Sequence, residues 1–262
     1  MSVDELGSDL TSDRWLAADR LAMWEHARVV GVERGASETV LRLRLGEVPD
    51  VHPGQYYLVR LAVDTPPGVV EQAYSLCSSS YPPSPEVEIA VRGVPGGRAS
   101  PVLARQVEVG DLLQVRGPFG FLTWTERDGG PLGLIGAGSG VAPLTAIVRY
   151  AAARGLTVPM TLLSSSRDRR SALLREPLEE LARDRAWFTL TSTVTRNPAD
   201  LTSPYRRRID ADMLTEVFTA APRERRPRIY YVAGPGDMVI AVRALIGSLG
   251  VADGAIYSED HA

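Results

Sequence analysis

The chain has 262 residues, of which 44% are hydrophobic and 23% charged, which excludes a wholly disordered protein and suits one large domain or two medium ones. The net charge of −3 argues against nucleic-acid binding. The charge is uneven along the chain. Residues 1–126 hold 11 arginines and 17 acidic residues, whereas residues 127–262 hold 18 arginines and 15 acidic residues. The second half is therefore the better host for an anion. All 29 basic residues are arginine, which excludes a lysine nucleophile and a Walker-type phosphate loop.

The few cysteine and histidine residues exclude further classes of site. The single cysteine, Cys77, excludes an internal disulfide, a thiolate zinc site and an iron–sulfur cluster held by several thiolates of this chain. His26, His52 and His261 lie too far apart in sequence to suggest a metal site. The N-terminus lacks a secretory signal, and no apolar run reaches the roughly 18 residues of a membrane span. We therefore expect a cytoplasmic protein without a metal or membrane partner.

The first half of the chain has the pattern of antiparallel strands. Residues 1–22 are expected to be an N-terminal extension, either a short amphipathic helix or a loose tail. From residue 23 onward, apolar residues recur at every second position in runs such as 27–32, 39–45 and 87–92. Proline and glycine turns separate about six such runs. This pattern predicts a six-stranded antiparallel β-barrel over residues 23–126.

The second half alternates between strands and helices. Strands are predicted at 132–136, 158–164, 187–194 and 229–233, and helices at 142–154, 177–184 and 238–249. This alternation predicts a parallel sheet with crossover helices over residues 127–262. The fold class is therefore a two-domain α+β chain, a β-barrel followed by an α/β domain.

A glycine-containing turn opens the predicted α/β domain. Gly138, Ser139 and Gly140 lie between a predicted strand and a helix that begins near Pro143. Glycines let the backbone approach a phosphate, and a helix N-terminus offers free N–H groups and a partial positive charge. The spacing departs from the dinucleotide-binding fingerprint, so nucleotide binding and a simple tight connection stay equally open.

Three other segments combine polar residues with turns. They are the strand residues Tyr74, Ser75 and Leu76, the loop Gly97, Arg98, Ala99 and Ser100, and the turn Gly234, Pro235 and Met238. The first could pack on a flat ligand, the second could hold a phosphate, and the third lies where open α/β sheets bind ligands. Each also has an ordinary interpretation, as a strand end, a helix cap near Ser100 and a turn. Their order along the chain is not easily explained by the ordinary interpretations.

That order resembles the ferredoxin–NADP reductase superfamily over residues 24–260, and most closely the reductase components of bacterial oxygenases and the small flavin reductases. The resemblance implies a barrel that holds FAD, or FMN, and an α/β domain that holds NADPH or NADH. It implies that hydride passes from the nicotinamide to flavin N5 and that electrons then leave to a separate acceptor. A ferredoxin or an oxygenase component is the expected partner, with free flavin or oxygen as a fallback.

The resemblance also implies the site residues. The implied catalytic residues are Ser75, beside flavin N5, and Tyr74, packed against the isoalloxazine. The implied cofactor contacts are Gln72, Tyr74, Ser75, Leu76, Arg92, Gly97, Arg98, Ala99, Ser100, Gly138, Ser139, Gly140, Pro143, Ser166, Arg167, Gly234, Pro235, Met238 and His261. Arg167 could bind a 2′-phosphate through paired hydrogen bonds, which slightly favours NADPH, or could lie in a solvated loop.

Three residues depart from the family's pattern. Gln72 stands where an arginine usually pairs with the flavin phosphates, so the flavin is held more weakly or Arg92 or Arg98 compensates. Ala233 stands where a cysteine often lies beside the nicotinamide. His261 stands where an aromatic residue is expected, and it either stacks on the flavin or belongs to a frayed tail, which we favour.

These departures leave two functions open. The first, which we favour, is an NAD(P)H-dependent flavoprotein reductase. The alternative is a degenerate reductase scaffold that acts as a non-redox binding or assembly subunit.

Overall fold

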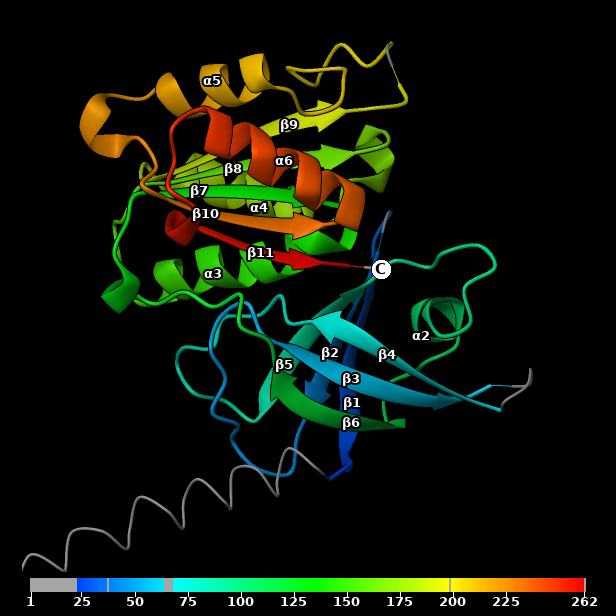
Figure 1. Ribbon diagram of the computed structural model, residues 1–262. Coiled ribbons are helices and arrows are strands. Elements are labelled where there is room, and N and C mark those ends of the chain that lie inside the picture. Colours follow the sequence, from blue (N-terminus) through cyan, green and yellow to red (C-terminus); the bar gives the residue numbers. More distant parts are fainter. Residues whose placement is uncertain (1–22, 37, 64–67, 198, 262) are drawn as a thin grey trace, which may run out of the picture.

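The computed structural model describes residues 23–36, 38–63, 68–197 and 199–261. The expected N-terminal extension, residues 1–22, lies outside the described residues. The described part contains a six-stranded antiparallel sheet and a five-stranded parallel sheet, stacked one above the other in Figure 1. No helix in these four ranges is long and apolar enough to cross a membrane.

The first sheet forms the predicted barrel, in the order β4-β3-β6-β1-β2-β5. Its strands are β1 (Glu25–Arg34), β2 (Thr39–Arg44), β3 (Tyr56–Ala62), β4 (Val69–Ser75), β5 (Glu86–Val91) and β6 (Leu112–Phe119), and helix α2 (Ser100–Arg105) follows β5. Burial alternates along β2 and β3, so that every second side chain enters the core. A bridge between Leu76 and Ile89 joins the end of β4 to β5 and closes the sheet.

The second sheet has the order β11-β10-β7-β8-β9. Its strands are β7 (Leu132–Ala137), β8 (Met160–Ser166), β9 (Phe188–Val194), β10 (Ile229–Gly234) and β11 (Ile256–Asp260), and its helices are α3 (Val141–Ala153), α4 (Arg175–Asp184), α5 (Ala211–Thr219) and α6 (Gly236–Ser248). Helices α3 and α4 pack on one face of the sheet, and α5 and α6 pack on the other. This arrangement confirms the predicted α/β fold.

Two elements were not predicted from the sequence. Helix α5 begins after Asp210, whose carboxylate accepts a hydrogen bond from the Met213 N–H at 2.8 Å. That cap, together with apolar residues at positions 213, 214, 217 and 218, is a helix signal that was available in the sequence. Strand β11 lies at the edge of the sheet, and only Ile256 in it is buried, so it carries almost no hydrophobic pattern.

The two domains share one apolar core. Cys77 and Trp124, which lie in the first half of the chain, pack with Leu144 and Val148 of α3. Trp124 is fully buried, and its indole N–H donates to the Gly129 carbonyl at 2.9 Å. Burial raises the pKa of the Cys77 thiol to about 12, consistent with the core role expected for this residue. The barrel is therefore held against α3.

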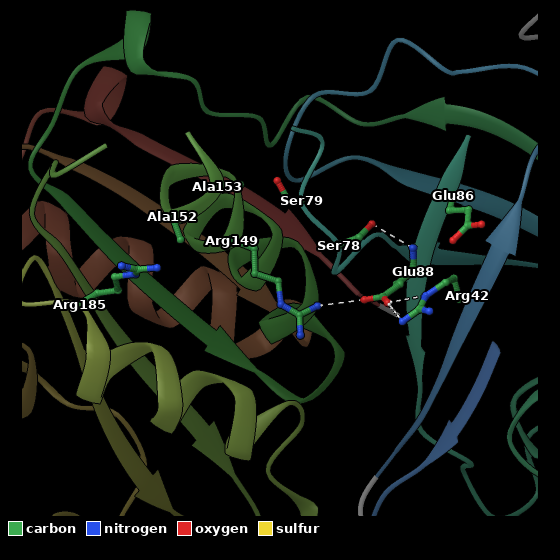
Figure 2. A pocket seen from close by; sticks show the side chains of 9 residues that line it. All are labelled: Arg42, Ser78, Ser79, Glu86, Glu88, Arg149, Ala152, Ala153 and Arg185. Atoms are coloured by element: carbon green, nitrogen blue, oxygen red, sulfur yellow. Dashed lines mark hydrogen bonds and ion pairs between the residues drawn. The ribbon is translucent and has the colours of Figure 1, made fainter. Parts of the chain in front are cut away.

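A polar network lies beside this core, in a groove of about 440 Å³ (Figure 2). The Arg149 guanidinium of α3 donates to the Cys77 carbonyl at 2.9 Å and to the Glu88 carboxylate at 3.2 Å. Arg42 donates to the other Glu88 oxygen at 3.1 Å, and the Glu88 N–H donates to the Ser78 hydroxyl at 2.9 Å. Glu88 thus joins both domains through charge-assisted hydrogen bonds.

We expect Glu88→Gln to lower the free energy of unfolding by about 1–2 kcal/mol, because Arg42 and Arg149 both lose a charged acceptor. The side chains of Glu88 and Arg149 are only 21% and 23% exposed, so water screens their interaction weakly. The measurement is equilibrium unfolding in urea. Glu86→Gln is the matched control, because Glu86 lies on the same strand as Glu88 but its partner, Arg44 of β2, is more exposed. This variant should cost well under about 1 kcal/mol. Equal losses in the two variants would contradict a special role for Glu88.

Candidate functional site

A cleft of about 1100 Å³ lies between the barrel and the α/β domain, and we call it the interdomain cleft. Its α/β wall comes from the turn after β7 and from the end of β11, where the described chain reaches the junction of the two domains (Figure 1). The cleft therefore lies at the carboxyl ends of parallel strands, where open α/β sheets bind ligands.

Ten of the site residues expected from the sequence line this cleft. They are Gln72, Tyr74, Ser75, Arg92, Gly97, Arg98, Ala99, Ser100, Ser139 and His261. Leu76 does not line it, because its side chain is 2% exposed and packs in the barrel core. Pro143 is buried within α3, and Ser166 and Arg167 lie at the carboxyl end of β8, beyond the lining residues.

The two predicted glycine turns pack against each other. A Cβ atom on Gly140 would lie 2.2 Å from the backbone carbonyl of Ala233, at the end of the adjacent strand β10. Gly234 has a φ of +151°, and a Cβ atom there would lie 2.6 Å from the Met238 methyl group and 3.0 Å from the Ala137 carbonyl. Only glycine permits this close approach, which brings the turn at 138–140 to the edge of the cleft.

The barrel wall presents a hydroxyl group without a partner. The Tyr74 hydroxyl is buried and makes no hydrogen bond within the described residues. Burial raises the pKa of this phenol, so it stays protonated and can donate or accept. An unmade hydrogen bond at a buried group costs about 1–3 kcal/mol, so a ligand with a polar edge is the expected partner. An aromatic, flat ligand such as a flavin fits this wall.

Positive charge gathers where the two walls meet. Arg92 lines the cleft, and its guanidinium nitrogen lies 3.3 Å from the point where a Cβ atom on Gly138 would be. Its pKa is lowered, first by burial and second by the charge of Arg167. Within the described ranges neither arginine's side chain has a carboxylate partner. The Arg92 guanidinium beside the glycine turn, with the charge of Arg167 close to it, favours the binding of an anion such as a phosphate.

The glycine loop of the barrel leads into a helix as expected. The sequence places Ser100 at or near the helix cap, and the helix is present as α2 with Ala99 at its N-cap position. Ser100 is its first residue, however, and its hydroxyl accepts the Val94 N–H at 3.1 Å, so it closes the preceding loop instead of capping the helix. The cap makes no side-chain hydrogen bond. Arg98 and Gly97 line the cleft from the same loop.

The expectation of a frayed tail at His261 is wrong. The His261 N–H donates to the Gly234 carbonyl at 2.8 Å, which continues the pairing of β11 with β10. Its imidazole Nδ1 lies 3.2 Å from the Ser139 hydroxyl, and Nε2 lies 3.0 Å from a Glu259 carboxylate oxygen. His261 therefore forms part of the α/β wall.

Sequence reasoning missed several residues of the cleft. Tyr56 and Glu259 line it, and Tyr56 packs against Phe119 with ring centroids 5.9 Å apart. Phe121 also lines it and is 97% exposed. Tyr56 follows the alternation of its strand like any barrel residue, so no local signal marks it. Glu259 lies two residues before His261, and its charge in that segment is the signal that the sequence offers.

Comparisons with known proteins agree with this geometry. Residues 34–124 match the oxidoreductase FAD-binding domain family, and residues 134–244 match the oxidoreductase NAD-binding domain family. A ferredoxin–NAD(P)(+) reductase component of the naphthalene 1,2-dioxygenase system of Pseudomonas putida is 27% identical over 219 residues, which are 84% of this chain and 63% of that protein. The propane 2-monooxygenase reductase component of Mycolicibacterium smegmatis is 26% identical over 73% of this chain and 53% of its own length.

Solved structures show the same fold. A cytochrome P450 reductase of Amycolatopsis has a TM-score of 0.74 and 26% identity, with 91% of this chain and 69% of that chain covered. A ferredoxin NADP+ reductase of Neisseria gonorrhoeae, solved with FAD and NADP, has a TM-score of 0.74 at 19% identity, with 90% and 98% covered. The chain belongs to the ferredoxin–NADP reductase-like superfamily, with an FAD-binding domain followed by an NAD-binding domain. It spans about 63% of the length of the oxygenase reductase components it matches first.

The contact between the glycine turns predicts the effect of one methyl group. Gly140→Ala should lower the free energy of unfolding by about 1–3 kcal/mol, because the new Cβ atom meets backbone atoms that cannot rotate away. Thermal and urea unfolding measure this loss. Gly46→Ala is the control, since nothing lies within 4 Å of its Cβ position, and its stability should change little. A stable Gly140→Ala variant would contradict the close approach.

Proposed function

We propose that the protein is an NAD(P)H-dependent flavoprotein oxidoreductase that takes hydride from NAD(P)H and delivers electrons to a separate acceptor. The observation that carries this proposal is the interdomain cleft, in which Tyr74 and Ser75 of the FAD-binding domain face Ser139 of the NAD-binding domain. The proposal assigns residues 23–126 to the flavin and residues 127–262 to the dinucleotide.

The flavin side of the cleft fits FAD on three counts. Tyr74 offers a ring and an unpartnered buried hydroxyl, Ser75 offers a second hydroxyl beside it, and Arg98 brings positive charge from the loop before α2. Gln72 lines the cleft as a neutral amide, so Arg92 and Arg98 are the residues that would compensate for its missing charge. When bound, the flavin accepts hydride at N5 and can release electrons singly. The chain's own part is to hold the two rings in line.

The dinucleotide side needs charge from outside its glycine turn. The turn at 138–140 and the first turn of α3 contain no basic residue, so their N–H groups alone face a phosphate. Arg92 reaches this turn from the barrel and would neutralise the pyrophosphate there. Arg167 follows the end of β8, and we propose it as the residue that would bind a 2′-phosphate, which favours NADPH.

The partner we propose is a redox protein. The matched relatives include ferredoxin–NAD(P)(+) reductase and monooxygenase reductase components. A ferredoxin or an oxygenase component is therefore the acceptor that these relationships support.

The first experiment is an anaerobic visible spectrum of the FAD-loaded protein before and after addition of NADPH and, separately, of NADH. Rapid bleaching of the flavin absorbance is expected, and the faster nucleotide identifies the preferred donor. The degenerate scaffold would be supported instead if the protein bound neither FAD nor FMN, or if the bound flavin never bleached. The departures from the family pattern at Gln72 and Ala233 are the reason for considering this alternative.

Ser75→Ala should slow flavin reduction about 10- to 100-fold, because one hydrogen-bonding group beside the reacting ring is lost while the fold is retained. Stopped-flow recording of the loss of flavin absorbance measures the rate. Ser80→Ala is the control, since Ser80 lies in the following loop, outside the cleft. Reduction as fast in Ser75→Ala as in the wild type would show that Ser75 does not lie at the flavin.

Arg167→Ala should raise the Michaelis constant for NADPH about tenfold and leave that for NADH nearly unchanged, because only NADPH has the 2′-phosphate that the guanidinium would bind. Steady-state reduction of ferricyanide measures both constants. Arg183→Ala, on the outward side of α4, is the matched control. An equal effect on both nucleotides would remove Arg167 from the 2′-phosphate site.

A further inference from the structure

The hydrogen bonds of His261 define where its proton lies. A carboxylate only accepts hydrogen bonds, so the Nε2 atom that lies 3.0 Å from Glu259 must carry a proton. In the neutral imidazole the other nitrogen, Nδ1, then has no proton and accepts. Its partner at 3.2 Å is the Ser139 hydroxyl, which must donate. Neutral His261 therefore takes up the only proton that the Ser139 hydroxyl can offer.

This direction matters because Ser139 belongs to the glycine turn. A phosphate bound at the turn accepts hydrogen bonds and needs donors around it. With its proton committed to His261, the Ser139 hydroxyl can present only lone pairs to such a ligand. The neutral state of His261 is thus unfavourable for an anion at this turn.

Protonation of His261 reverses the hydrogen bond. Both imidazole nitrogens then donate, so Nδ1–H donates to the Ser139 oxygen and the Ser139 proton is free to turn toward a phosphate. The imidazolium also adds a positive charge beside the turn, while its bond to Glu259 becomes an ion pair. One proton therefore changes both the donor set and the charge of the site.

We propose that His261 is a positioning residue which couples binding of the dinucleotide's pyrophosphate to the uptake of one proton, through the orientation of the Ser139 hydroxyl. This inference rests on the proposed function, because it assumes that a nicotinamide dinucleotide occupies the turn at 138–140.

Other ionisable groups lie on the elements around His261. Strand β11 contributes Glu259 and Asp260, and the Asp260 carboxylate faces the start of α6, where Asp237 lies. Tyr56 lies across the cleft. Its ring and the second carboxylate oxygen of Glu259 both lie close to the point where a Cβ atom on Gly120 would be. Arg92 approaches the turn from the barrel. Arg92 and Arg98 line the same cleft as Glu259 and Asp260, so a proton on His261 adds to the positive charge of the two arginines and offsets the negative charge of the two carboxylates.

The test measures binding without turnover. NAD+ and NADP+, the oxidised dinucleotides, are titrated into the FAD-loaded 262-residue chain by calorimetry at pH 6, 7 and 8, in two buffers with different ionisation enthalpies. We expect about tenfold tighter binding at pH 6 than at pH 8, with net proton uptake on binding at pH 7.

Three variants assign the effect. In His261→Gln, a side chain that does not titrate, the extra affinity at pH 6 and the proton uptake should disappear. Ser139→Ala keeps the His261–Glu259 pair but lacks the hydroxyl, and its pH dependence should be smaller than that of the wild type. His52→Gln, in an exposed loop of the barrel, is the control and should match the wild type. Because each ligand's own titration is common to all variants, the differences between variants belong to the protein.

The outcomes separate the two proposals. Binding with the same pH dependence in wild type and His261→Gln, or without proton uptake in wild type, would overturn the inference and leave the proposed function standing. No binding of either dinucleotide at any pH would contradict the proposed function and the inference together.

Discussion

The close contact between two glycine turns is the constraint on which the site depends. Strands β7 and β10 are neighbours in the parallel sheet, and the turns that follow them meet where Gly140 approaches the Ala233 carbonyl. This contact leaves no space for a side chain, so it fixes the path of the backbone at the carboxyl edge of the sheet. Ser139 of the turn and Ala142 of the first turn of α3 consequently line the interdomain cleft.

The second wall is fixed by packing behind the cleft. Trp124 and Cys77 are buried against α3, and Glu88 ties the barrel to Arg149 on the same helix. The helix that begins at the glycine turn is therefore also the helix on which the barrel rests. Any displacement of the barrel would disturb a shared apolar core, so Tyr74 and Arg92 are held opposite the turn by the same packing that stabilises the fold.

Charge is distributed so that Arg92 in the cleft and Arg167 near it lack a carboxylate partner among the described residues. Elsewhere in the described chain, Arg149, Arg154 and Arg175 each have a carboxylate partner. Arg92 instead has a lowered pKa, first because it is partly buried and second because the charge of Arg167 lies nearby. Like charges held together in a partly buried site favour an anionic ligand, because the anion relieves both the repulsion and the burial cost.

The sequence predicted what periodicity and glycine can reveal, and it missed what depends on contacts distant along the chain. Alternation located the barrel strands, and alternating strands and helices located the α/β domain. The same signals could not show that β11 adds to the sheet edge, since its pairing with β10 is made by backbone atoms and not by buried side chains. His261 was misjudged for the same reason. Its position depends on the Gly234 carbonyl and on Ser139, 122 residues away in the chain, and no local pattern encodes such a partner. The departure from an aromatic residue at this position is therefore not simply a loss, because the imidazole gains two hydrogen bonds that a phenyl ring could not make.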